Sequence, residues 1–128
     1  MLTINTERIG DMAIVECDGR IVRSDAAVRL RAAVTSQEGA DIVVLDFSEV
    51  STVEGGGLGM LRFLQRWAHD SQVQLKIFNP SSSVYYRLQQ ASPVDKFEIS
   101  SLPEMMALLA HAEDQQKTRA QDATPLAA

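Results

Sequence analysis

Residues 46–61 read DFSEVSTVEGGGLGML, and this stretch decides the predicted fold. It follows the apolar run DIVVLD at 41–46, which shows no alternation and is typical of a strand covered on both faces. A loop then leads through three successive glycines into a helix predicted over 55–69. The stretch therefore predicts a buried strand, a tight loop and a helix, which is the unit of an α/β protein.

The rest of the chain alternates in the same way. Strands are predicted over 2–6, 12–17, 41–46, 73–78 and 97–99, and helices over 24–35, 55–69, 82–90 and 105–112. Gly10 and Asp11 suit a hairpin between the first two strands, Ser24 suits an N-cap, and Ser101 with Glu104 form a capping box. The order ββαβαβαβα predicts a mixed sheet of about five strands with helices mainly on one side. The other face would be left partly open for docking.

Length and composition indicate one globular domain. The chain has 128 residues and a mass of 14.1 kDa, with 45% hydrophobic and 23% charged residues. We expect the domain to span 1–113 and residues 114–128, which are polar, small and aperiodic, to form a mobile tail. The last helix is expected to run a little way into that tail.

Charge and residue counts exclude several functions. The net charge of −5 argues against a nucleic-acid partner, because phosphate contacts need a clustered basic surface. No apolar run approaches the roughly 20 residues that span a bilayer, and no secretory signal is evident, so we expect a cytoplasmic protein without membrane insertion. The chain has one cysteine, Cys17, which cannot form an internal disulfide. Its two histidines, His69 and His111, are too few for most metal sites. No metal or cofactor is expected.

The three glycines at 55–57 leave several interpretations open. One is a tight strand-to-helix turn with close packing beneath it. Another is an anion or nucleotide site at a helix N-terminus, but neither G-x-x-x-x-G-K-[ST] nor G-x-G-x-x-G is present, since Met60 breaks the spacing. No nucleophile, base and acid fall together either, so we expect a protein that is not an enzyme.

A third interpretation comes from a family resemblance. Asp46-Phe47-Ser48-Glu49-Val50 and Gly57-Leu58-Gly59 resemble the two conserved blocks of the STAS domains, the family of the bacterial anti-sigma factor antagonists. Gly19-Arg20-Ile21 resembles the family's opening motif, and Phe78-Asn79-Pro80 resembles its later strand-to-helix region. The resemblance covers about residues 1–112 and implies the STAS fold.

The resemblance also implies a switch, and this chain departs from it. Family members carry D-S-S-G before the helix, and a partner kinase that is also an anti-sigma factor phosphorylates the second serine. Here Glu54, Gly55 and Gly56 take the places of the aspartate and both serines, and Val22 replaces an aspartate of the opening motif. Gly56 is thus a degenerate phosphosite without a hydroxyl. The resemblance therefore implies a transcription regulator that works by protein–protein interaction, and the departure predicts a non-switchable binder of an anti-sigma factor or related regulator.

The partner surface is predicted to combine the loop with one side of the following helix. Its residues are Thr52, Val53, Glu54, Gly55, Gly56, Gly57, Leu58, Met60, Phe63 and Trp67. Met60, Phe63 and Trp67 form a second apolar stripe beside Leu58, Leu61, Leu64 and Ala68, which indicates either a deeply buried helix or an exposed partner face. The alternatives within the fold are a subunit docking on the ATPase of a lipid-trafficking ABC transporter, or a small anion or nucleotide sensor. A homodimer is also compatible with the sequence.

Two groups of hydroxyls lie near the expected surface. Ser51 and Thr52 are either ordinary loop residues or a substitute phosphosite. Ser81 or Ser82 is expected to cap the helix over 82–90. Asp46 is expected to accept hydrogen bonds from the amides that follow its strand.

Overall fold

The computed structural model describes residues 2–22, 25–91 and 96–122, with side chains described at 2–22, 26–91 and 96–117. Its elements are β1 Leu2–Ile9, β2 Met12–Ile21, α1 Asp25–Thr35, β3 Ile42–Val53, α2 Gly56–Asp70, β4 Gln74–Phe78, α3 Ser82–Ala91, β5 Glu98–Ser100 and α4 Leu102–Asp122. The predicted element order is confirmed. The predicted N-cap Ser24 lies outside the described residues.

The strands form one sheet in the order β1-β2-β3-β4-β5. β1 and β2 are antiparallel and joined by a turn at Gly10, whose φ is 55°, while the remaining neighbours are parallel. Glycine suits this turn because a positive φ costs it little. The predicted hairpin and mixed five-stranded sheet are therefore confirmed.

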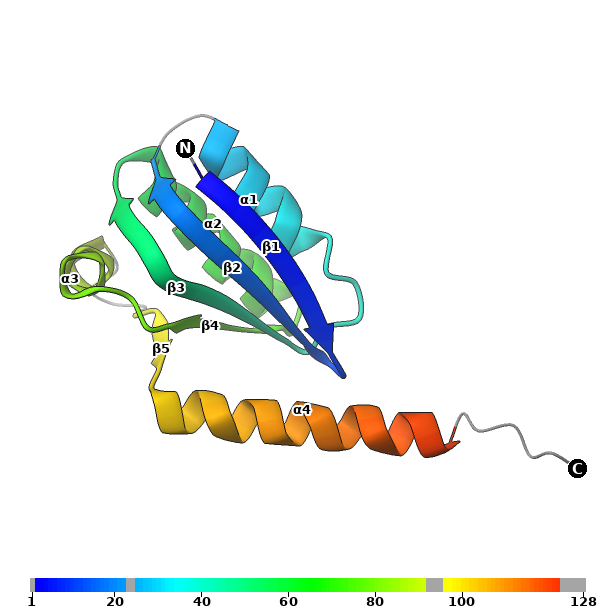
Figure 1. The fold of residues 1–128 in the computed structure, drawn as a ribbon. Coiled ribbons are helices and arrows are strands. Elements are labelled where there is room, and N and C mark those ends of the chain that lie inside the picture. The colour runs from blue at the N-terminus through cyan, green and yellow to red at the C-terminus, as the bar shows by residue number, and fades with distance from the viewer. Residues whose placement is uncertain (1, 23–24, 92–95, 123–128) are drawn as a thin grey trace, which may run out of the picture.

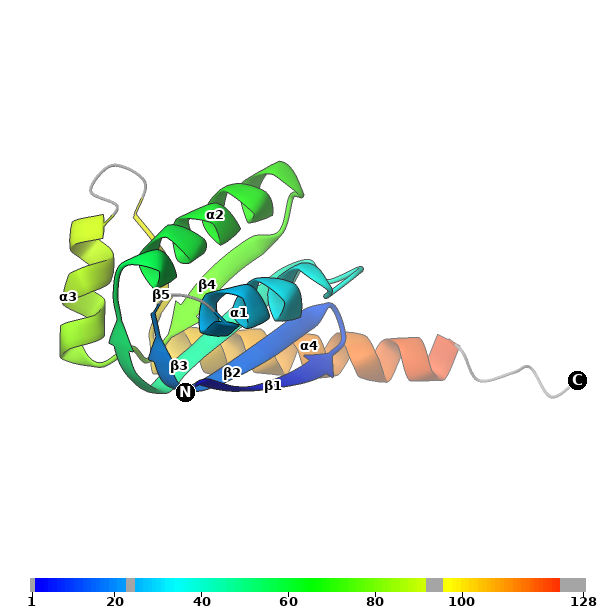
Figure 2. The ribbon, with the colours of Figure 1, turned by 90° about the horizontal axis from the view of Figure 1, so that it is seen from above.

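Most helices pack on one face of the sheet. Leu30 and Val34 of α1 and Leu61 and Leu64 of α2 are fully buried against it, and α1 and α2 lie side by side there (Figures 1 and 2). α3 adds Val84 and Leu88 to the same core cluster. Burial of this apolar surface is the main force that holds the fold together.

α4 lies across the opposite face (Figure 1). Met105 and Ala112 of this helix are buried against Met12, Ile14 and Val44, which lie near the amino ends of β2 and β3. The face expected to be open is therefore covered along this lower part. Glu16 and Asp18, farther along β2 and pointing to the same side, stay exposed.

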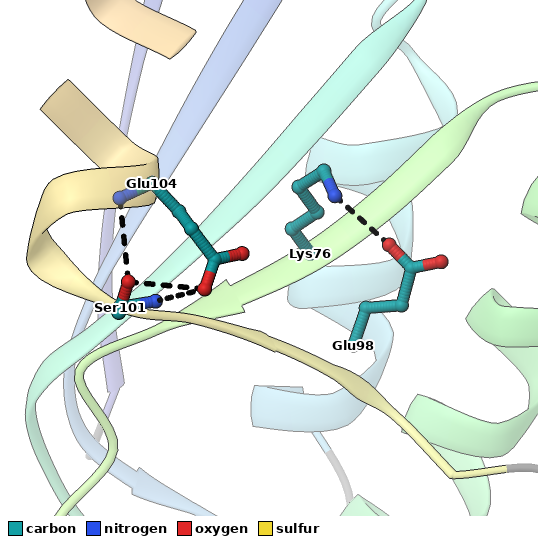
Figure 3. Close-up of polar contacts among 4 residues, drawn as sticks. All are labelled: Lys76, Glu98, Ser101 and Glu104. Atoms are coloured by element: carbon teal, nitrogen blue, oxygen red, sulfur yellow. Dashed lines mark hydrogen bonds and ion pairs between the residues drawn. The ribbon is translucent and has the colours of Figure 1, made fainter. Parts of the chain in front are cut away.

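The start of α4 is fixed by the predicted capping box. Ser101 Oγ accepts a hydrogen bond from the Glu104 amide at 3.3 Å, and the Glu104 carboxylate accepts one from the Ser101 amide at 3.4 Å (Figure 3). Lys76 of β4 and Glu98 of β5, paired in register, form an ion pair at 2.9 Å nearby.

α4 continues past residue 113, where the domain boundary was expected. It reaches Asp122, and Gln116 accepts a hydrogen bond from the Gly10 amide at 3.0 Å. Residues 115–121 read QQKTRAQ and contain neither glycine nor proline, so nothing in their sequence ends the helix early. The segment from 114 to 122 is thus helical, and 123–128 lie outside the described residues.

Candidate functional site: the corner between β3 and α2

β3 is longer than predicted, and its last residues carry the candidate site. The strand runs to Val53, so the segment expected to be a loop is paired with the end of β2. Two register shifts occur here, between Glu16 and Asp18 and between Gly19 and Arg20, and each inserts an extra residue in β3. The true loop is therefore only Glu54 and Gly55, between Val53 and the first residue of α2.

The backbone of this corner is held by hydrogen bonds. The Glu54 amide donates to the Ile21 carbonyl at 3.1 Å, which ties the corner to the end of β2. The Gly57 amide donates to the Glu54 carbonyl at 2.9 Å, and the Leu58 amide to the Gly55 carbonyl at 3.1 Å. The corner is a fixed turn and not a free loop.

The glycines at 55, 56 and 57 meet different structural requirements. Gly55 has φ 53° and ψ −118°, a conformation that side-chain-bearing residues rarely adopt. A Cβ on Gly57 would lie 2.7 Å from the Ile21 carbonyl carbon and closer still to its oxygen, so only glycine fits. Gly56 is exposed, begins α2 and does not share the positive φ of Gly55. Gly55 and Gly57 are thus explained by geometry, whereas Gly56 is not.

An ion pair joins the corner to α3. Arg87 Nη2 lies 2.9 Å from Glu54 Oε1, and both side chains are half exposed. On the adjacent edge, Asn79 Nδ2 donates to Ser48 Oγ at 3.2 Å. The contact between Glu54 and Arg87 shows that the segments following β3 and β4 lie at one end of the sheet.

We expect Glu54→Gln to lower the free energy of unfolding by less than about 1 kcal/mol, because half-exposed ion pairs are screened by water. The double-mutant cycle with Arg87→Gln, followed by urea denaturation, measures the coupling. A coupling well above about 1 kcal/mol would show that the ion pair is a main support of the corner.

The neighbouring hydroxyls lie outside the corner, within β3 and just before α3. Ser51 Oγ donates to the Gly19 carbonyl at 3.2 Å, and Thr52 is half-buried at the end of β3. Ser81 caps α3 as predicted, since its Oγ accepts from the Val84 amide at 3.3 Å. The sequence from Val53 to Asp70 contains no serine, threonine or tyrosine. The corner and α2 thus offer no hydroxyl for phosphorylation.

The predicted surface residues separate into exposed and buried sets. Glu54, Gly55, Gly56 and Phe63 are exposed; Thr52, Leu58, Met60 and Trp67 are half-buried; Val53 and Gly57 are buried. The side chain of Val53 is only 1% exposed and belongs to the core, so it supports the corner from beneath.

The second apolar stripe of α2 is divided as well. Met60 and Trp67 pack against the core beneath α1 and α2, whereas the Phe63 side chain is 42% exposed. The guanidinium of Arg31 on α1 lies over the Phe63 ring, 4.5 Å from its centroid. The stripe is therefore neither wholly buried, as expected for a deeply buried helix, nor wholly exposed, as expected for a partner face.

The acidic and thiol groups nearby have structural roles. Asp46 Oδ1 accepts hydrogen bonds from the Ser48 amide at 3.0 Å and from the Ser48 hydroxyl at 2.6 Å. The predicted bond to a following amide therefore forms, but it lies inside β3 and not in a loop, because the strand continues past Asp46 to Val53. Burial, and secondarily the Asp46 carboxylate, raise the pKa of the Cys17 thiol to about 12. Cys17 is therefore a neutral core thiol at physiological pH and no nucleophile.

The part of the chain that the structure describes contains neither a metal-ligand cluster nor a membrane-spanning helix. Among those residues no group of three or more His, Cys, Asp or Glu side chains is placed to hold a metal ion. None of the helices described is long and apolar enough to span a membrane.

The family model of the STAS domain matches residues 3–104. The chain belongs to the STAS family. No curated protein matches its sequence. STAS domains are typically regulatory and not enzymatic, and the fold predicted from the resemblance is confirmed.

Solved structures show the same fold at low sequence identity. The unphosphorylated anti-sigma factor antagonist SpoIIAA superposes with a TM-score of 0.68 at 16% identity, covering 85% of this STAS chain and 97% of that chain. The phosphorylated form of SpoIIAA, a Bacillus cell-fate determinant, gives 0.64 at 14% identity, covering 84% and 99%. A protein of the DUF3478 family from Shewanella loihica PV-4, described as SpoIIAA-like, gives 0.56 at 12%, covering 87% and 93%.

Sequence reasoning missed two residues that shape this region of the STAS domain. Arg87 reaches Glu54 from α3, and Arg31 covers Phe63 from α1. Both contacts join residues more than 30 positions apart, so neither periodicity nor a local motif could have revealed them. Arg87 lies on the helix predicted after the fourth strand, and that placement is the one signal that pointed toward the corner.

Proposed function

We propose that this STAS domain is a protein-binding regulator that contacts its partner through the corner of β3 and α2 and is not switched by phosphorylation. The partner is an anti-sigma factor or a related regulator, and the protein acts in the cytoplasm. The observation that carries the proposal is Gly56, which lies exposed at the first position of α2 without a hydroxyl.

The geometry supports a preformed contact surface. Gly55 and Gly57 fix the turn, and the hydrogen bond from Glu54 to Ile21 anchors it to the sheet. A rigid corner loses little conformational entropy on binding. Gly56 adds neither bulk nor charge, so a partner can approach the backbone closely.

A charge at position 56 should disrupt binding without disrupting the fold. Gly56→Glu places a carboxylate at the N-terminus of α2, where the helix dipole tolerates it. Desolvating that carboxylate at an interface is costly, so we expect affinity for an anti-sigma factor to fall at least about tenfold. Gly56→Gln, which has the same size and no charge, is the matched control.

The missing switch is tested with kinase and ATP. We expect the wild-type chain to gain no phosphate by mass spectrometry and to stay bound to the anti-sigma factor when ATP is added. The variant Gly56→Ser, which restores the hydroxyl, is expected to be phosphorylated and released. Phosphate on the wild-type chain at Ser51 or Thr52, with release, would contradict the proposal.

The identity of the partner separates the remaining alternatives. Recovery of a transport ATPase in place of an anti-sigma factor would favour the ABC-transporter role. A thermal shift that grows with nucleotide or phosphate concentration would favour an anion sensor, because ligands stabilise the state that binds them.

A further inference from the structure

The outer surface of α1 and α2 is basic although the chain is acidic. Its exposed side chains include Val28, Arg31, Arg62, Phe63 and Arg66, which we call the arginine–phenylalanine face. The described side chains of α1, at residues 26–35, include no acid, and in α2 the only acid is Asp70 at its last residue. The net charge of −5 is therefore carried by other parts of the chain.

The arginines of this face, Arg31, Arg62 and Arg66, form no hydrogen bond or ion pair with the residues that the structure describes. Other arginines are engaged: Arg8 bonds to Glu38 and Gly10 carbonyls, Arg29 to the Leu2 carbonyl at 2.6 Å, and Arg87 to Glu54. Within the described part of the chain the donors of the three face arginines have no acceptor, so they can bind an external anion.

Arg31 is the best placed of the three. Its guanidinium is positioned over the Phe63 ring at 4.5 Å, which restricts the side chain before any partner arrives. A guanidinium offers a planar set of donors that suits a carboxylate in a bidentate pair. Because the guanidinium is already positioned, less side-chain entropy is lost when that pair forms.

Apolar side chains lie on the same face. Val28 is 62% exposed and Phe63 is 42% exposed. Val28 precedes Arg31 by three residues on α1, and Arg66 follows Phe63 by three on α2, so each pair shares one side of its helix. Exposed aromatic and arginine side chains in one patch are typical of the residues that dominate protein interfaces.

We propose that the arginine–phenylalanine face binds an acidic segment of a partner protein, with a carboxylate on Arg31 and an apolar side chain against Val28 and Phe63. This proposal rests on the proposed function insofar as the chain is a protein-binding module, but it uses a different surface from the corner. A protein partner is favoured over nucleic acid or lipid for two reasons. Three arginines form only a small basic area, and Val28 and Phe63 between them offer no hydrogen-bond donor to a phosphate.

The test uses peptides selected from a random phage-displayed library against the full chain. We expect enrichment of peptides that combine Asp or Glu with an aromatic or aliphatic residue. Their affinity, measured by fluorescence anisotropy, should fall at least about tenfold with Arg31→Glu/Arg66→Glu and with about 0.5 M NaCl. Lys117→Glu, an exposed charge reversal on α4, is the matched control and should leave affinity within about twofold.

Further variants make each outcome decisive. If the double charge reversal lowers the circular dichroism signal, Arg31→Gln/Arg66→Gln replaces it. Peptides that bind equally well to the arginine variants would overturn the inference. So would binding of phosphatidylglycerol vesicles that depends on the same arginines. A peptide that binds wild type and Gly56→Glu equally, but not the arginine variants, supports this face whatever the fate of the corner.

Discussion

Replacing Gly57 by alanine is expected to lower the free energy of unfolding by about 2 kcal/mol or more. The new Cβ would press on the backbone carbonyl of Ile21, which cannot move without shifting the end of β2. The same carbonyl accepts the Glu54 amide, so the shift would also strain the corner. Urea denaturation followed by circular dichroism measures the loss.

Gly59 provides the matched control for this substitution. It lies in the same helix two residues later, and nothing lies within 4 Å of a Cβ added there. Gly59→Ala should therefore raise stability by up to about 1 kcal/mol, because alanine favours the helix. Equal effects of the two alanines would refute the packing of Gly57 beneath β2.

The second large effect is expected in alkali and depends on Cys17. Burial raises the pKa of this thiol to about 12, above its ordinary value of 9.0. Because the folded pKa is raised, the contribution of Cys17 is fully present below pH 9 and is lost as the pH rises toward 12. Between these pH values the Cys17 thiol is ionised in the unfolded chain and neutral in the folded chain.

The loss should amount to about 2 kcal/mol between pH 9 and pH 11, because half of the unfolded thiols are already ionised at pH 9. Urea denaturation at several pH values gives the free energy of unfolding as a function of pH. The contribution of Cys17 is the difference between the slope of that curve for wild type and for Cys17→Ala, because the other groups that ionise in alkali are common to both. A thiol reagent should also modify Cys17 only after unfolding. Parallel pH profiles, or rapid modification of the folded chain, would show that the thiol is exposed or ionised.

The difference between predicted and observed structure is clearest in β3. Its buried side chains after Leu45 are Phe47, Val50 and Val53, spaced by two, three and three residues. The extra residues in β3 at the two register shifts break the alternation by which a strand is recognised. The sequence pattern therefore predicted a strand that ends at Asp46. In the structure, pairing with β2 extends the strand to Val53.

Local signals were reliable where local chemistry determines the structure. The capping box of Ser101 and Glu104, the hairpin at Gly10 and the cap at Ser81 all formed as predicted. The corner between β3 and α2 was predicted from its motif. The long-range partners Arg87 and Arg31 were not, because they depend on how α3 and α1 pack in the folded domain.

The charge distribution and the corner together describe a module with two separate candidate contacts. Glu54, Gly55 and Gly56 form the corner at one end of the sheet, and the arginine–phenylalanine face covers the outer side of α1 and α2. α2 connects them, since it begins at the corner and carries Phe63. Partners can thus be separated by variants at position 56 and at Arg31 with Arg66.

The central claim is that the corner itself touches the partner, and amide hydrogen exchange tests it most directly. A complex with an anti-sigma factor, trapped by crosslinking, would be compared with the free chain by mass spectrometry. We predict slower exchange in peptides that contain residues 54–59, with or without ATP. Unchanged exchange at the corner, together with protection of a distant surface such as α4, would contradict the account.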